Sequence, residues 1–273
     1  MPSKPSQILI SPASPNLDAE YHLIFYITGN PGLISYYDSF LRTLHQLLTE
    51  APTSQTDTFH IFGQSLLGFE DDDVPVKSTR LPYTLEDQIV SRLQLLHDQR
   101  IPSGPRQGQE YDSIIIIGHS VGTYILMELL QRLRESSSSL KVKGGVLLMP
   151  TVMGLAESAS GVMATPLLKL PGITWGVGLF AKALTLLVPA PALRRLVGLV
   201  MGMPEDAAAV TTRFLKSKLG VWQALHMAKD ELETITIDKW DEEIWGIEQD
   251  DSTSTFKTPR LFFFFAEEVY LCY

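Results

Sequence analysis

The feature that most constrains the fold is a run of four isoleucines, Ile114–Ile117, followed at once by Gly118-His119-Ser120-Val121-Gly122. β-branched side chains favour a strand, and apolar side chains on both of its faces indicate that both faces are buried. We therefore expect residues 113–117 to form a central strand of a sheet. The apolar spacing that follows, up to about Glu135, is typical of a helix. The five residues 118–122 then occupy a sharp turn from strand to helix.

This turn matches the G-x-S-x-G pattern of a nucleophile elbow. In such a turn a serine is held in a strained backbone conformation, and its neighbours two positions away must be nearly free of side chain. The turn presents the hydroxyl at the carboxyl edge of the sheet, above a helix N-terminus that favours negative charge. The pattern predicts Ser120 as a nucleophile, with Gly118, His119 and Gly122 completing the elbow. The alternative is a buried serine in a glycine-rich turn.

An acyl-transfer site also needs two backbone N–H groups directed at the oxyanion. Val121 follows the candidate nucleophile and is expected to supply one of them. The other is expected from the loop Gly29-Asn30-Pro31-Gly32, which follows an apolar strand at 22–28. Because proline has no N–H, Asn30 is the candidate donor. An ordinary Asn-Pro turn is the alternative.

Apolar runs alternate with helical patterns along the chain, which predicts an α/β fold with a mostly parallel sheet. Further strands are expected at 59–62, 144–149 and 260–265, and helices at 34–48 and 83–99. Residues 1–16 resemble an irregular lead-in and not a signal peptide. We expect no transmembrane helix, because the longest segment without a charged residue, 21–37, is interrupted by the glycine-proline loop.

Composition and charge exclude several classes of function. The chain has 273 residues, of which 45% are hydrophobic and 19% charged. This length is enough to bury a hydrophobic core without a disulfide or a metal. Its net charge of −9 argues against a nucleic-acid partner. Cys272 is the only cysteine, so an intrachain disulfide is excluded and a cysteine zinc site is not expected. The acidic run Glu70–Asp73 lacks the spacing of a calcium loop, and we expect neither a metal nor a cofactor.

Residues 151–203 differ from the rest of the chain. They carry only five charged residues with a net charge of +3, against −12 for the remainder, and prolines divide them into short segments. We expect short apolar helices that form a lid. Their apolar faces either pack on one another and on the core, or lie in a lipid monolayer. The best candidates for lipid contact are 184–188 and 196–200, with Arg194 and Arg195 at the headgroups.

Four segments together resemble the lipid droplet-associated hydrolase family, and the chain is similar to a fungal member of it. These segments are HLIFYITGNPGLISYYDSFL, TLEDQI, IIIIGHSVGTYILMELL and VWQALHMAKDELETI. The similarity extends over about residues 20–265. The resemblance implies an α/β-hydrolase fold with Ser120 as nucleophile. It also implies hydrolysis of neutral-lipid or sterol esters at the cytosolic face of the lipid droplet monolayer or the endoplasmic reticulum membrane.

The acid and the base of a triad are not identified from the sequence. The order in α/β-hydrolases is serine, acid, histidine, and the resemblance implies an aspartate shortly after the strand at 260–265, where this chain has Val269. Glu267 and Glu268 are candidate substitutes for the acid. His226 is the only histidine after Ser120, and a structural role is the commoner one for such a residue. We expect a truncated or mis-spliced form of a longer enzyme, which lacks the last strand and helix of the sheet.

These observations predict three parts of the chain. Residues 1–150 form the N-terminal part of the hydrolase core with the elbow, 151–250 a helical lid or lipid-facing insertion, and 251–273 the last core strand and a divergent C-terminus. The expected function is a serine carboxylic-ester hydrolase acting on a lipid ester, inactive or impaired in this form. The alternative is a non-catalytic lipid-droplet surface protein with a hydrolase-like fold that affects lipid storage.

Overall fold

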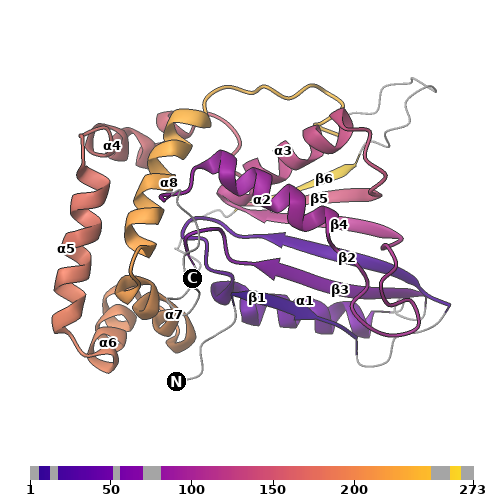
Figure 1. The fold of residues 1–273 in the computed structure, drawn as a ribbon, viewed down its shortest axis with the longest axis horizontal. Coiled ribbons are helices and arrows are strands. Elements are labelled where there is room, and N and C mark those ends of the chain that lie inside the picture. Colours follow the sequence, from indigo (N-terminus) through magenta and orange to yellow (C-terminus); the bar gives the residue numbers. More distant parts are fainter. Residues whose placement is uncertain (1–5, 13–17, 52–55, 70–80, 247–258, 266–273) are drawn as a thin grey trace.

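A single sheet forms the centre of the protein. The computed structural model describes residues 6–12, 18–51, 56–69, 81–246 and 259–265. Its six strands follow the order β1-β3-β2-β4-β5-β6 (Figure 1), with β1 antiparallel to β3 and all other neighbours parallel. The strands are β1 (Gln7–Ile10), β2 (Glu20–Ile27), β3 (Asp57–Gln64), β4 (Ser113–His119), β5 (Val142–Leu148) and β6 (Arg260–Phe264).

The isoleucine strand β4 lies between β2 and β5, and the central position expected from the sequence is confirmed. Ile114 and Ile116 belong to the core cluster beneath α2 and α3, whereas Ile117 belongs to a second cluster on the opposite face, beneath α1. Burying one isoleucine side chain stabilises a fold by about 1.5–3 kcal/mol. Alternate side chains of β4 therefore gain this energy on both faces, which holds the strand in the middle of the sheet.

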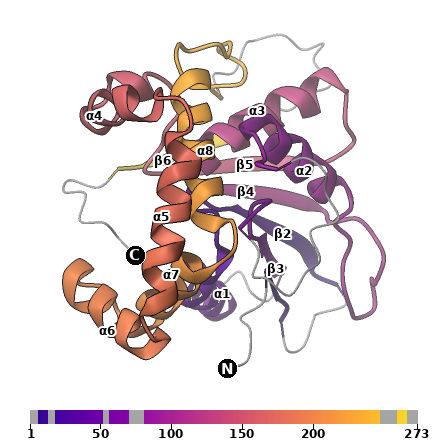
Figure 2. The same cartoon turned by 60° about the vertical axis from the view of Figure 1, so that its left-hand side comes forward.

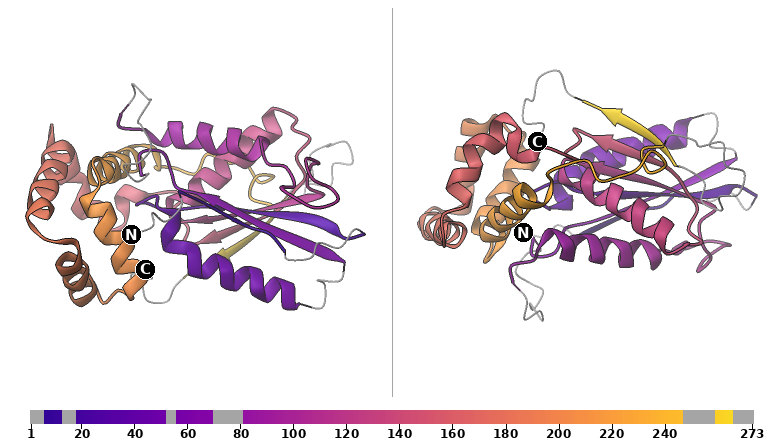
Figure 3. Two further views of the ribbon diagram at one scale, coloured as in Figure 1. Left: turned by 60° about the horizontal axis from the view of Figure 1, so that its bottom comes forward. Right: turned by 90° about the horizontal axis from the view of Figure 1, so that it is seen from above.

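Helices cover both faces of the sheet (Figure 3). One face carries α1 (Asp38–Glu50), which follows the short 3₁₀ helix η1 (Ile34–Tyr37), and the other carries α2 (Leu85–His97) and α3 (Val121–Glu135). A capping box formed by Thr84 and Asp87 begins α2, with both reciprocal hydrogen bonds present.

Between β5 and β6 the chain forms a group of helices beyond the carboxyl ends of the parallel strands (Figure 1). Figure 2 shows α8 between the sheet and α5. No single helix of the described segments is long and apolar enough to cross a membrane; α4 and α5 meet the length and composition only as a pair bent by 93°. The elements are η3 (Leu155–Glu157), α4 (Ala159–Leu168), α5 (Ile173–Leu187), α6 (Ala190–Met201), α7 (Glu205–Lys216) and α8 (Gly220–Thr234).

The structure corrects one expectation about the N-terminal residues. Residues 7–10 do not belong to an irregular lead-in, because they form β1 and pair with residues 61–64 of β3. The strand expected at 260–265 is present as β6 and is paired with β5 along one edge. The acidic run Glu70–Asp73 lies outside the described residues.

Candidate active site

The elbow has the geometry that the pattern predicts. Ser120 adopts φ 51° and ψ −124° at the junction of β4 and α3, a conformation that L-residues rarely occupy, and its side chain is partly exposed. Its N–H donates to the Leu148 carbonyl over 3.0 Å, which anchors the elbow to β5. A Cβ atom on Gly118 would lie 2.4 Å from the Gly122 oxygen, and one on Gly122 would lie 2.5 Å from the Ile27 oxygen. Both positions therefore require glycine.

The loop after β2 runs directly against this elbow. A Cβ atom on Gly29 would lie 3.1 Å from Cβ of Ser120 and 2.9 Å from Nδ1 of His119. Gly29 therefore packs closely against Ser120, and Asn30 is the next residue of this loop. Val121 is the first residue of α3. Within the described segments, neither the Asn30 N–H nor the Val121 N–H donates a hydrogen bond to a protein acceptor. Both N–H groups therefore remain candidate donors to an oxyanion formed at Ser120.

Tyr37 joins the loop to the elbow, a role that the sequence analysis missed. Its hydroxyl lies 2.9 Å from Nδ1 of His119 and accepts from the Gly29 N–H at 3.3 Å. Burial lowers the pKa of His119, so the ring is neutral at pH 7 and has a nitrogen that can accept. The YYDSF segment that follows the GNPG loop was the available signal, but the sequence alone does not show where its tyrosines point.

Thr123 ties the elbow to the segment after β5. Its hydroxyl donates to the Ser120 carbonyl over 2.6 Å and accepts from the Thr151 N–H over 2.9 Å. Both hydrogen bonds hold the backbone around Ser120, and neither uses its hydroxyl. The strained conformation of Ser120 is therefore supported from β5 as well as from α3.

The side chain of Asn30 is hydrogen-bonded to α8. Its Nδ2 donates to the Ala224 carbonyl and to Oε1 of Glu231, each over 3.0 Å. Glu231 is 7% exposed, and burial raises its pKa to about 8, with Asp230 adding to the rise and the hydrogen bond from Asn30 opposing it. The carboxyl is therefore mostly protonated at pH 7. The sequence analysis assigned Glu231 no role.

The structure brings no described histidine or carboxylate into a hydrogen bond with the Ser120 hydroxyl. His226 lies on α8, half-buried, and burial lowers its pKa. Its neighbours Asp230 and Glu233 counteract this shift. Glu267, Glu268 and Val269 lie outside the described residues.

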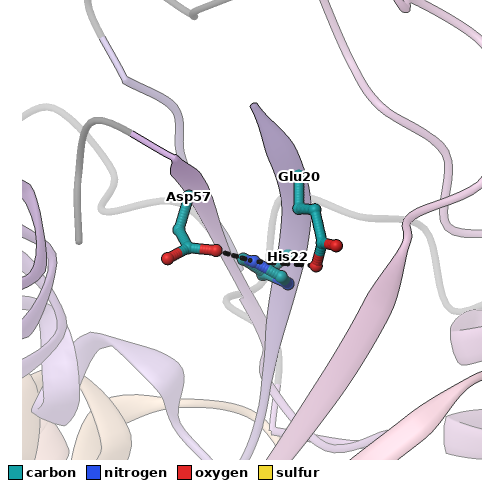
Figure 4. Close-up of side chains that lie close together, drawn as sticks. All are labelled: Glu20, His22 and Asp57. Atoms are coloured by element: carbon teal, nitrogen blue, oxygen red, sulfur yellow. Dashed lines mark hydrogen bonds and ion pairs between the residues drawn. The ribbon is translucent and has the colours of Figure 1, made fainter. Parts of the chain in front are cut away.

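One side-chain cluster has ligand spacing for a metal ion, at the opposite edge of the sheet from Ser120. It consists of Glu20, His22 and Asp57, at the amino ends of β2 and β3 (Figure 4). Hydrogen bonds account for it: Nε2 of His22 lies 2.8 Å from Asp57 Oδ1, and Nδ1 lies 2.7 Å from the Ser113 hydroxyl. Glu20 lies 4.0 Å from Nε2 of His22 and has a cationic partner in Lys143, at 3.5 Å.

Sequence comparison identifies the family. The model of the lipid droplet-associated hydrolase family matches residues 20–268. The chain belongs to this family. Curated relatives named lipid droplet-associated hydrolase include the human protein, 30% identical over 152 residues, covering 54% of this chain and 42% of the human one. The Dictyostelium discoideum relative is 25% identical over 218 residues, and the alignment covers 78% of this chain and 62% of the relative's length. The chain therefore aligns with about two fifths of the human relative's length.

This member of the lipid droplet-associated hydrolase family has an α/β fold, with a mostly parallel sheet and helices on both of its faces. Similar solved structures include juvenile hormone epoxide hydrolase from the silkworm Bombyx mori, 13% identical with a TM-score of 0.47, covering 82% of this chain and 54% of that one. Another is the α/β hydrolase MGS-M2 from a deep-sea metagenome, also 13% identical with a TM-score of 0.47, covering 84% of this chain and 70% of that one. The expected family is confirmed by the family model, and the α/β class with a mostly parallel sheet is confirmed by the strand order.

Proposed function

We propose that this protein is a serine carboxylic-ester hydrolase in which Ser120 is the nucleophile. The Ser120 oxygen attacks the ester carbonyl carbon, and the Asn30 and Val121 N–H groups stabilise the oxyanion that forms. The ester C–O bond then breaks, the departing alkoxide takes up the proton that the Ser120 hydroxyl gave up, and the alcohol leaves. Water hydrolyses the acyl-enzyme, which releases the acid and returns a proton to the Ser120 oxygen. The single observation that carries this proposal is the positive φ of Ser120 beside the Gly29–Asn30 loop. A structural serine in a turn needs neither this strain nor two unused backbone donors.

We propose a lipid ester as substrate, in the class of neutral-lipid or sterol esters. Residues 151–250 would serve as a lid, since their helices lie beyond the carboxyl ends of the strands, where Ser120 is (Figure 1). The family name supports a lipid-related substrate. No metal or cofactor takes part in the proposed reaction.

We further propose that α4–α6 bind the cytosolic face of a lipid droplet monolayer or of the endoplasmic reticulum membrane. These helices expose large apolar side chains to an extent unusual for a surface in water. Basic residues accompany them, namely Lys169, Lys182, Arg194 and Arg195, and favour anionic headgroups. The most exposed apolar side chains are Val162, Met163, Phe180, Leu186, Leu187, Leu199 and Val200.

A second function has one observation in its favour. Because no described histidine or carboxylate contacts the Ser120 hydroxyl, the second candidate is a non-catalytic protein that binds the droplet surface and affects lipid storage. A serine without a base is a weak nucleophile near neutral pH. The two functions share the lipid-binding helices and differ only in whether Ser120 reacts.

Hydrolysis of p-nitrophenyl esters of increasing acyl length separates the two candidates. The hydrolase proposal predicts turnover that increases with acyl length and is lost in Ser120→Ala. Hydrolysis of equal rate in Ser120→Ala contradicts it. No hydrolysis by the wild-type protein, together with binding to lipid droplets, favours the non-catalytic function.

A further inference from the structure

A buried carboxyl group lies behind the loop that carries Asn30. Glu231 is on the last turn of α8, 7% exposed, and its Oε1 accepts from Nδ2 of Asn30 over 3.0 Å. The two residues are 201 positions apart in the chain. This hydrogen bond therefore connects the helical group after β5 to the loop after β2.

The orientation of the Asn30 amide follows from its other partner. The Ala224 carbonyl can only accept, and it lies 3.0 Å from the same Nδ2. The NH₂ group must therefore face α8, where it donates to both Ala224 and Glu231. Two acceptors from one helix fix the side chain of Asn30, and with it the direction of the peptide that follows Gly29.

We propose that Glu231 is a positioning residue, which holds the Asn30 side chain so that the Asn30 N–H stays directed at the oxyanion beside Ser120. This inference rests on the proposed function of Ser120 and adds a residue to it. Glu231 does not touch the substrate; it acts through Asn30. The helix α8 and the loop after β2 thereby form one unit.

The chemistry of the position supports this role. Burying a carboxyl group in a helix interface costs free energy that an apolar side chain of similar size avoids. Among the described residues, Asp230 is the charged neighbour whose field acts on Glu231, and it disfavours ionisation. A neutral carboxyl at neutral pH still accepts through Oε1, which is the contact that Asn30 uses.

Other contacts of α8 separate this role from general support of the helix. Asp230 accepts from the Leu85 N–H over 2.6 Å, and Gln223 bonds both the N–H and the carbonyl of Tyr83, each over 2.8 Å. These hydrogen bonds join α8 to the start of α2 and do not reach Asn30. Asp230 therefore provides a matched control, one position from Glu231 on the same helix.

The test is the second-order rate of Ser120 modification by a fluorophosphonate probe, measured on the full chain by intact mass. Glu231→Gln keeps the acceptor oxygen, and we expect its rate within about threefold of wild type. Glu231→Leu removes the acceptor, and we expect at least a ~10-fold lower rate, because a misdirected oxyanion donor loses most of its stabilising effect. Asp230→Asn should lower thermal stability without changing the rate. Circular dichroism confirms folding, and Glu231→Asp, which withdraws the acceptor by one methylene, replaces Glu231→Leu if that variant does not fold.

A rate for folded Glu231→Leu or Glu231→Asp equal to wild type overturns the inference. A rate lowered equally in Glu231→Gln overturns it too, since that variant should rescue the contact. If wild-type protein is not modified at Ser120, the proposed hydrolase function fails, and hydrogen–deuterium exchange of residues 28–34 becomes the readout. Faster exchange in Glu231→Leu but not in Glu231→Gln or Asp230→Asn then supports the positioning of the loop. Unchanged exchange in all three overturns it.

Discussion

The hydroxyl of Tyr37 lies 2.9 Å from Nδ1 of His119, the residue directly before Ser120. The Gly29 N–H donates to the same tyrosine oxygen at 3.3 Å. One side chain thus connects the elbow to the loop that carries Asn30. The relative position of Ser120 and Asn30 depends on it.

Replacing Tyr37 by Phe should loosen this connection. We expect the free energy of unfolding to fall by about 1–2 kcal/mol, since a partly buried hydrogen bond is lost and its partners remain unpaired. The rate of Ser120 modification should fall severalfold as well. Tyr36→Phe is the matched control, because the Tyr36 hydroxyl bonds Thr211 on α7 over 2.8 Å. Urea unfolding and probe labelling of both variants test this; equal labelling rates for the two would count against a role of Tyr37 at the elbow.

Glu231 should make stability depend on pH in an unusual direction. Its pKa is raised from 4.5 to about 8 in the folded protein. Between these values the folded state holds a proton that the unfolded state has released, so this group's contribution is complete below pH 4.5 and is lost as the pH rises through about 8. The slope from one such group is at most about 1.4 kcal/mol per pH unit.

Glu231→Gln should remove this slope, while Asp230→Asn should keep most of it, because burial is the larger cause of the raised Glu231 pKa. Urea unfolding of the three proteins between pH 5 and 8 measures the difference. Parallel pH profiles for wild type and Glu231→Gln would show that the Glu231 carboxyl ionises normally in the folded protein.

The elbow should not tolerate a methyl group. A Cβ atom on Gly122 would meet the Ile27 oxygen at 2.5 Å and the Thr28 oxygen at 2.7 Å, both backbone atoms that cannot move independently. We expect Gly122→Ala to lower the free energy of unfolding by about 3 kcal/mol or more. Gly176→Ala, on α5 with no atom within 4 Å of the new Cβ, should be neutral or stabilising by up to about 1 kcal/mol. Thermal unfolding compares the two variants. A small loss of stability in Gly122→Ala would contradict the close contact between Gly122 and the backbone of β2.

Attachment to lipid should depend on the exposed face of α5. Leu186 and Leu187 are 71% and 85% exposed, and changing both to Glu should abolish flotation with lipid droplets, because two charges would have to enter the monolayer. The control is Leu47→Glu with Val90→Glu, which adds the same charge at exposed apolar positions on α1 and α2. Flotation of the Leu186/Leu187 variant at the control's level would exclude this face of α5 as the lipid-binding surface.

Local sequence patterns predicted the elements that are determined by residues adjacent in the chain. The four isoleucines of β4 and the glycines at 118 and 122 identify a central strand and a strained turn without reference to the rest of the molecule. β1 was missed because its four residues lie among prolines and serines, and only pairing with β3 makes them a strand. Such short edge strands carry little periodicity.

The partners of the elbow were missed for a related reason. Glu231 stands in the acidic sequence DELE, which is typical of a solvated helix face, and acidic residues are seldom buried. Only the packing of α8 against the loop after β2 shows that this one carboxyl is buried against Asn30. Contacts between residues 201 positions apart have no local signature.

The central claim is that Ser120 is the reactive nucleophile, and mapping a fluorophosphonate adduct tests it most directly. Protein incubated with the probe is digested, and the modified peptide is sequenced by mass spectrometry. The account predicts one adduct, on Ser120, that is absent from Ser120→Ala and from heat-unfolded protein. An adduct on another residue, or no adduct on folded wild-type protein, would contradict it.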